Sequence, residues 1–393
     1  MSGIVLSASV RQNLLSLQST AELLSTTQNR LATGNKVNSA LDNPTNFFTA
    51  QGLNNRASDI SNLLDSIGNG VQVLQAANTG LTSLQKLVDT AKSIANQVLQ
   101  TSVGYSAKST AVSAANAGAT DANLLGATLA TGDVLAIAAT GGGTATSITF
   151  GAAAGQVSTL TQLNAALAAN NLTASIDNTT GKITLTTTND AASSTIGAIT
   201  GTASGAGKAF NALTPSAPVA DAASQAIRSS LVAQYNGIIS QITNTAQDSS
   251  FNGINLLNGD TLKLTFNETG KSTLSITGVS YSATGLGLAS LTSGTDFLDN
   301  SSANKVLTAL GSAATSLRTE ASALGSNLSI VQIRQDFSKN LINVLQTGSS
   351  NLTLADTNEE AANSQALSTR QSIAVSALAL ANQSQQSVLQ LLR

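Results

Sequence analysis

The feature that most constrains this chain is a row of residues at heptad spacing near its N-terminus. Its members stand alternately four and three residues apart, and only one of them is polar: Val10, Leu14, Leu17, Ala21, Leu24, Gln28 and Leu31. This spacing places a narrow apolar seam along one side of an α-helix about 40 Å long. Because an isolated helix of this kind is only marginally stable in water, we predict that it pairs with another helix along its length.

A matching row lies near the C-terminus and predicts the partner helix. It comprises Ala374, Leu378, Ala381, Gln385, Val388 and Leu392. Leucines also crowd the last residues of the sequence, where frayed ends are usually polar, which favours burial against other copies of the chain. We therefore assign as self-assembly seams Val10, Leu14, Leu17, Leu24, Leu31, Leu378, Val388, Leu391 and Leu392.

Further long helices are predicted inside these two. Gly34 offers a helix stop and Pro44 cannot continue a helix interior, so residues 34–45 connect the first helix to a second one over residues 46–100. Asp221 can cap a helix that runs to about residue 247, and another helix is expected over residues 302–347. Alternation within residues 262–266 and 274–276 predicts a β-hairpin.

The middle of the chain differs sharply in composition. Residues 104–217 are dense in Gly, Ala, Thr and Ser and contain only seven charged side chains. Their pattern predicts a hairpin, a short helix and a second hairpin, with residues 191–217 as a return linker. This segment therefore forms an inserted α+β domain.

The expected fold is mainly α. Long antiparallel helices from both ends of the chain form coiled-coil-like bundles, with a small β-hairpin and the inserted domain. The predicted parts are an inner coiled coil (1–42 and 354–393), an outer helical bundle with the hairpin (43–103 and 218–350), and a surface-exposed variable domain (104–217).

Composition excludes several classes of function. The chain has no Cys, His or Trp, so thiol nucleophiles, thiolate metal sites, histidine bases and Ser-His-Asp triads are absent. Charged residues make up 10%, and the 18 basic and 20 acidic side chains leave no basic field for nucleic acid. Neither a signal peptide nor a run of about 20 apolar residues is visible, so no membrane insertion is expected.

Two motifs could suggest enzyme chemistry, and both have simpler interpretations. The Gly141–Gly143 run lacks the Gly-Lys-Ser/Thr sequel of a phosphate loop and reads as a flexible hairpin turn. Glu359 and Glu360 are adjacent glutamates, but they follow Asp356 and fit the first turn of a helix. We expect no catalytic, cofactor-binding or metal-binding residues, no cofactor, and no enzyme.

Three motifs in the flanks resemble those of the bacterial flagellin family. They are Arg-Leu-Ala-Thr-Gly-Asn-Lys-Val-Asn-Ser-Ala at 30–40, Phe-Asn-Gly-Ile-Asn-Leu-Leu at 251–257, and the ending Ala-Leu-Ala-Asn-Gln-Ser-Gln-Gln-Ser-Val-Leu-Gln-Leu-Leu-Arg at 379–393. The middle segment resembles a module of flagellins and hook-associated proteins. The sequence departs from the common family pattern at 42–46, and its insert interrupts the outer helices rather than following the hairpin.

The resemblance implies a structural subunit that self-assembles into an extracellular flagellar filament for motility. It also implies secretion through the flagellar export apparatus, with a chaperone, a filament cap and hook-junction proteins as partners of a homopolymer. Two alternatives remain open: a hook-filament junction protein, and a secreted helical adhesin whose insert binds a glycan.

The resemblance also concerns immune recognition. In many flagellins a Toll-like receptor reads Leu-Gln-Arg-Val-Arg-Glu-Leu-Ala on the second helix. Residues 84–91 match this segment, with Lys86, Val88 and Thr90 in place of two arginines and a leucine. Loss of the arginine contacts and the apolar anchor predicts poor receptor activation.

Overall fold

The computed structural model describes residues 8–391 and divides into two compact units. Unit 1 comprises residues 1–70, 263–274 and 330–393, and unit 2 comprises residues 71–262 and 275–329. The long helices are α1 (Ala8–Thr33), α2 (Pro44–Gln100), α4 (Ala222–Asp248), α5 (Asn300–Thr353) and α6 (Thr357–Leu391). The predicted mainly α class, with helices from both ends of the chain packing together, is confirmed.

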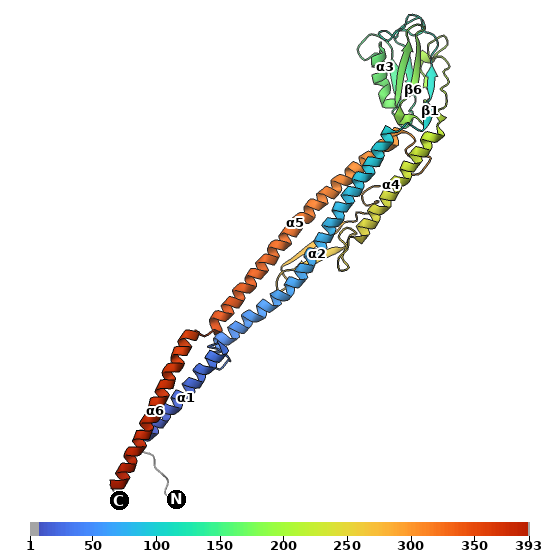
Figure 1. Ribbon diagram of the computed structural model, residues 1–393. Helices are drawn as coiled ribbons and strands as arrows, with labels where there is room; N and C mark the ends of the chain where they lie inside the picture. Colours follow the sequence, from blue (N-terminus) through green and yellow to red (C-terminus); the bar gives the residue numbers. More distant parts are fainter. Residues whose placement is uncertain (1–7, 392–393) are drawn as a thin grey trace. The chain divides into compact units, whose positions relative to one another are not determined.

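In unit 1, helix α1 lies beside α6, and the first half of α2 lies beside the last part of α5 (Figure 1). A small apolar cluster joins the latter pair through Ala57, Ile60 and Leu345. The Ser349 hydroxyl donates a hydrogen bond to the Ala50 carbonyl within the same contact. Both helix pairs bring together segments from opposite ends of the sequence, as the seams predict.

The start of α2 follows from two residues. Asn43 accepts hydrogen bonds from the backbone N–H groups of Asn46 and Phe47, through its side chain and its carbonyl, and so caps the helix. Pro44 occupies the first helical position, where its missing N–H costs no hydrogen bond. The residues that end the connecting loop are therefore the ones that begin the helix.

The hairpin β9 (Thr261–Thr265) and β10 (Thr273–Thr277) forms where the sequence alternates. In unit 1 its turn is held to two helices. Arg56 of α2 pairs with Glu268 at 2.7 Å, and the Arg334 guanidinium of α5 lies 5.6 Å from the centre of the Phe266 ring.

In unit 2, the remaining part of α2 buries a continuous row against α4 and α5. The row on α2 includes Leu74, Leu81, Leu84, Val88, Ala91, Ala95 and Val98. Arg228 of α4 is almost fully buried and binds the C-terminal end of α2 by donating to the carbonyls of Val98, Thr101 and Ser102. This side chain thereby satisfies carbonyls that a helix end leaves without intrahelical partners.

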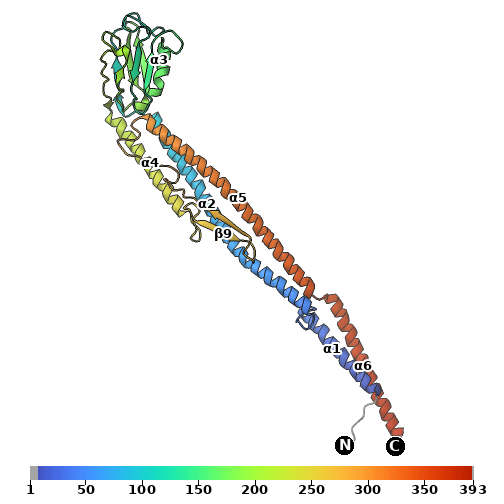
Figure 2. The same cartoon turned by 180° about the vertical axis from the view of Figure 1, so that it is seen from behind.

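The insert, also in unit 2, contains two three-stranded antiparallel sheets and helix α3 (Leu160–Leu167), which Figure 2 shows beside the strands. One sheet has the order β2-β6-β5 and the other β4-β3-β7. Their strands are β2 (Thr110–Val112), β3 (Val134–Ile137), β4 (Thr146–Thr149), β5 (Leu172–Asp177), β6 (Lys182–Thr187) and β7 (Ile199–Thr200). The predicted order of hairpin, short helix and hairpin is present.

The return segment 191–217 is more than the linker that the sequence suggested. Strand β7 pairs with β3, and the Phe210 ring stacks on Phe150 with 6.1 Å between ring centres. Both rings are fully buried in the core of the insert. The segment therefore completes a sheet and a core.

The insert leaves and rejoins the bundle at one place. Strand β1 (Tyr105–Ala107) pairs antiparallel with β8 (Val219–Ala220), and Tyr105 lies opposite Ala220. Asp221 then caps α4 by accepting from the Ala223 N–H, as predicted. The two ends of the insert are therefore adjacent.

Candidate assembly surface

Helix α1 faces α6 with a heptad row that contains both apolar and hydroxyl side chains. Val10, Thr20 and Thr27 are its buried residues, and Leu17 and Leu24 are half-buried. The spacing of the sequence selected Ala21 and Gln28 for two of these turns, but both are exposed. Leu14 and Leu31 are 38% and 40% exposed within a single chain.

The facing row on α6 keeps a strict alternation of four- and three-residue steps. Its buried or half-buried members are Glu360, Ser364, Leu367, Gln371, Ala374, Leu378 and Ala381. This is the register that the C-terminal seam predicts, and it places Leu378 toward α1. Val388 and Leu391 lie within helix α6, but the structure does not describe their side chains. Leu392 lies outside the described residues.

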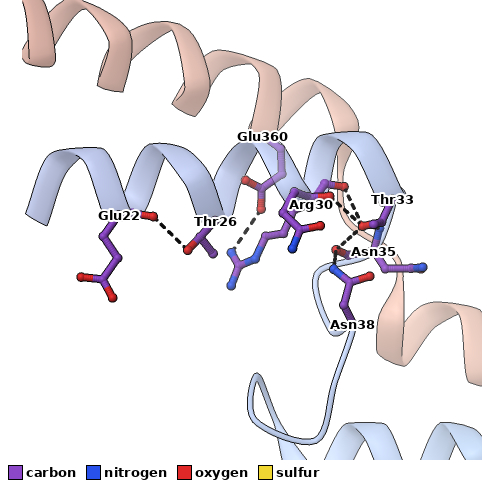
Figure 3. Close-up of polar contacts among 8 residues, drawn as sticks. Glu22, Thr26, Arg30, Thr33, Asn35, Asn38 and Glu360 are labelled. Atoms are coloured by element: carbon purple, nitrogen blue, oxygen red, sulfur yellow. Dashed lines mark hydrogen bonds and ion pairs between the residues drawn. The ribbon is translucent and has the colours of Figure 1, made fainter.

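One ion pair joins the two helices near the connecting loop. The Arg30 guanidinium lies 3.3 Å from the Glu360 carboxylate, with 37% and 11% of the two side chains exposed (Figure 3). Glu360 stands in the first turn of α6, which Asp356 caps by accepting from the backbone N–H groups of Asn358 and Glu359. Glu360 is thus a helix-start residue, as expected, and also links the chain's two end segments.

The connecting loop, residues 34–43, is tied to the end of α5. Asn35 pairs with Leu354, and the N–H groups of Lys36 and Val37 both donate to the Thr353 carbonyl. Figure 3 shows the side chains of Thr33 and Asn38 at the start of the loop, where both donate hydrogen bonds to the Asn35 carbonyl. The loop therefore has a defined conformation.

Several helices of unit 1 present apolar side chains that are about half exposed or more in the described structure. On α5 these are Ile330, Ile333, Phe337 and Val344, whose spacing puts them on one stripe. Further exposed apolar residues are Leu15 and Leu23 of α1 and Ile373, Val375 and Leu380 of α6. Apolar side chains on helices that are already paired on another face are typical of surfaces that contact other proteins.

Residues 8–391 contain no cluster of acidic side chains that could hold a metal ion. Within the same range, none of the helices has the length and apolarity needed to cross a bilayer.

Comparison with known proteins places both ends of the chain in one family. The model of the bacterial flagellin N-terminal helical region matches residues 5–129, and the model of the C-terminal helical region matches residues 307–392. Together the two matches span more than half of the chain and include α1, α2, α6 and most of α5.

The chain belongs to the bacterial flagellin family.

Similar flagellins include FljM and FljK of Caulobacter vibrioides, which are 32% and 31% identical to this chain over 165 residues. Each alignment covers 42% of this chain and 59% of the relative. Flagellin A of Rhizobium meliloti is 38% identical over 81 residues, or 21% of each chain. The matched part thus spans somewhat more than half the length of the Caulobacter flagellins.

The residues that match the receptor-recognised segment of other flagellins lie on unit 2. Lys86 and Thr90 are exposed one helical turn apart, and the Thr90 hydroxyl donates to the Lys86 carbonyl. Val88 is fully buried in the bundle. A protein that binds this face of the flagellin subunit would therefore contact Lys86 and Thr90 but not Val88.

Proposed function

We propose that this flagellin is a structural subunit that self-assembles into the extracellular bacterial flagellar filament and serves motility. The observation that carries the proposal is the apolar stripe on α5 together with the exposed leucines of α1. These side chains lie on helices that are paired elsewhere, and a second copy of the chain would remove them from water.

The proposal divides the chain into three working parts. Residues 1–42 and 354–393 form an inner coiled coil, residues 43–103 and 218–350 an outer bundle, and residues 104–217 an outward variable domain. The seam residues Leu14 and Leu31, exposed in one chain, contact neighbouring copies. Because a filament must grow without closing, these contacts are heterologous and join different surfaces of successive copies.

The partners implied by the family belong to the same proposal. They are the flagellar export apparatus, a chaperone, the filament cap and the hook-junction proteins. A structural role requires no cofactor, metal or catalytic residue, and we propose none.

The two alternative functions, a hook-filament junction protein and a glycan-binding adhesin, predict different properties. A hook-filament junction protein would share the terminal helices but would not form long filaments. A glycan-binding adhesin would present aromatic faces. In the insert Phe150 and Phe210 are buried against each other and Tyr105 is half-buried, which disfavours sugar binding there.

The test is expression of this chain as the sole flagellin in a flagellin-null cell, followed by electron microscopy and a swimming assay. Long filaments and restored swimming are expected. Secretion of the chain without long filaments would favour the junction protein, and secreted chain that binds glycan but never polymerises would favour the adhesin.

A further inference from the structure

A single leucine protrudes from the connecting loop of unit 1. Leu41 is 97% exposed, more than any other large apolar side chain that the structure describes. The turn that carries it is held by Asp42, whose carboxylate accepts from the N–H groups of Asn38 and Ser39 at 3.0 and 2.8 Å and from the Ser39 hydroxyl at 3.1 Å. Since the turn is fixed beforehand, binding through Leu41 would cost little ordering entropy.

A pocket opens beside the same loop, also within unit 1. It has a volume of about 300 Å³ and is lined by Asn35, Val37, Phe47, Ala50, Gln51, Asn54 and Thr353. Val37 and Ala50 are buried and form an apolar floor with Phe47, whereas Gln51 and Asn54 are exposed at the rim. An apolar centre inside a polar rim is the usual anatomy of a site that takes one anchoring side chain.

The apolar surface continues beyond the pocket. Phe48 is 63% exposed, and its ring meets that of Phe47 edge-on with 5.5 Å between ring centres. A partner anchored in the pocket would therefore also cover Phe48.

We propose that Leu41 of one copy inserts into this pocket of the next copy. The connecting loop then supplies the inserted leucine, and the loop together with the start of α2 and the end of α5 supplies the pocket. The inference rests on the proposed filament function and adds the residues of one contact to it. Leu41 does not fill the pocket of its own chain, because its side chain is almost wholly exposed.

The occupant is a second copy because both halves of the fit are present on every chain. Two copies that exchanged their leucines reciprocally would close a dimer, so filament growth requires the one-way form of the contact. In that form Leu41 of each copy enters the pocket of the next, and one free leucine and one free pocket remain at the ends of the row. Such a contact propagates, as filament growth requires. The amides of Asn35, Gln51 and Asn54 at the rim can bind the polar backbone of an incoming turn.

The chain has no native cysteine, which permits a clean cross-linking test. Filaments are assembled from an equal mixture of Leu41→Cys chains and Gln51→Cys chains and are oxidised mildly. A disulfide forms only when the two side chains come within bonding geometry. We expect covalent dimers that contain one chain of each kind, and a ladder of longer covalent oligomers from the double variant L41C/Q51C.

The matched control replaces the pocket cysteine by Thr49→Cys. Thr49 is exposed on the same turn of α2 but does not line the pocket, so its mixture with Leu41→Cys should give no mixed dimer. Intact filaments without the 41–51 cross-link, or a double variant that stops at dimers, would overturn the inference while leaving the filament function standing. Failure of the unmodified chain to form filaments would instead count against the proposed function.

A second measurement covers the case in which cysteine at position 41 blocks assembly. Leu41→Ala should raise the critical concentration for polymerisation about tenfold, because it removes most of a buried leucine side chain from the contact. Leu41→Met should retain near-normal assembly, since it keeps the apolar volume. Val112→Ala, at an exposed apolar position in the insert, is the control. Equal critical concentrations for all variants would contradict the contact.

Discussion

Arg30 and Glu360 show how single residues hold the ends of this flagellin together. They lie 330 positions apart in the sequence and pair across α1 and α6 at 3.3 Å. Glu360 is the more buried partner. Removing its charge would leave the Arg30 guanidinium without a carboxylate partner in a contact that is partly shielded from water, which is unfavourable.

Glu360→Gln should therefore destabilise the α1–α6 pair. Because Arg30 is more than a third exposed, solvent screening limits the expected loss to about 1 kcal/mol. The measurement is the temperature at which assembled filaments depolymerise. Glu359→Gln is the control, since Glu359 is exposed in the same turn and makes no ion pair in the described structure. Identical melting of both variants would show that the pair contributes nothing.

Asp42 gives the connecting loop a predictable response to acid. Its hydrogen bonds from the Ser39 and Asn38 N–H groups and the Ser39 hydroxyl hold the pKa of the carboxyl below its ordinary value. A group whose pKa is lowered by folding contributes its stabilisation above its ordinary pKa, and that contribution disappears as the pH falls through the lowered value.

Amide exchange of Asn38 and Ser39 should then be slow near neutral pH and should lose protection only in acid, below the ordinary range of an aspartate at about pH 4. The exchange is measured against pH after correction for intrinsic rates. In Asp42→Asn the pH-dependent change should vanish. Protection that is already lost well above the ordinary range would contradict the assignment.

Lys86 and Thr90 lead to a prediction on immune recognition. The resemblance implies an arginine and a leucine at these two positions in many flagellins. This chain has an ammonium group and a short hydroxyl side chain there, and Val88 is buried. We expect weak activation of the Toll-like receptor in a reporter cell, and partial recovery in the variant K86R/T90L. A response equal to that of an enteric flagellin would refute the prediction.

The sequence predicted some residues of the α1–α6 contact within the chain and missed others, for a physical reason. Two heptad registers are possible on α1, and both contain Val10, Leu17 and Leu24. At the turns between these residues one register uses Ala21 and Gln28, and the other uses the preceding residues, Thr20 and Thr27. The choice by apolarity favoured Ala21, but the structure buries Thr20 and Thr27 toward α6. Threonine bonds back to its own helix, as Thr20 does to the Ser16 carbonyl, and can therefore be buried at low cost.

At the scale of elements, helices α1 and α6 bury fewer apolar side chains in the described structure than the other long helices do. The buried residues of α1 are Val10 and two threonines, whereas α2 buries a long row of leucines, isoleucines and valines. Narrow helical pairs of this kind depend on further contacts for stability.

We therefore expect α1 and α6 to be disordered in dilute monomer and helical in the filament. Amide exchange on monomer should show little protection of residues 14–31 and strong protection of residues 81–98 on α2. Filaments should protect both segments. Strong protection of residues 14–31 in the dilute monomer would contradict this expectation.

Element boundaries were predictable where a local residue sets them. Asp221 begins α4 and Asp356 begins α6, as expected, each by accepting cap hydrogen bonds. Helix α2 begins at Pro44, two residues before the expected start at residue 46, because Asn43 caps it and a proline is tolerated at the first helical position. Strand β7 was missed because it is two residues long and forms only by pairing with β3, more than 60 residues earlier. No local pattern encodes such a pairing.

At the scale of the whole molecule, we expect the insert to be separable from the bundle of unit 2. Strands β1 and β8 bring its ends together, and its core residues lie within 111–210. Its few side-chain links to the bundle include Ser193 with Asp299 and Asp190 with Asn304.

Deletion of residues 106–216, with a short Gly-Ser joint between Tyr105 and Ala217, should leave filament assembly intact, because inserts with adjacent ends are generally dispensable to their host. The deleted chain is expressed in a flagellin-null cell and examined by electron microscopy. A chain that is secreted but never polymerises would mean that the insert supplies an essential contact between subunits.

The most direct measurement of the central claim is a helical reconstruction by electron cryomicroscopy of filaments grown from this chain alone. We predict a continuous filament in which α1 and α6 form the innermost layer and the α5 stripe from Ile330 to Val344 is covered by a neighbouring copy. Absence of filaments, or filaments in which that stripe and the leucines of α1 remain exposed to solvent, would contradict it.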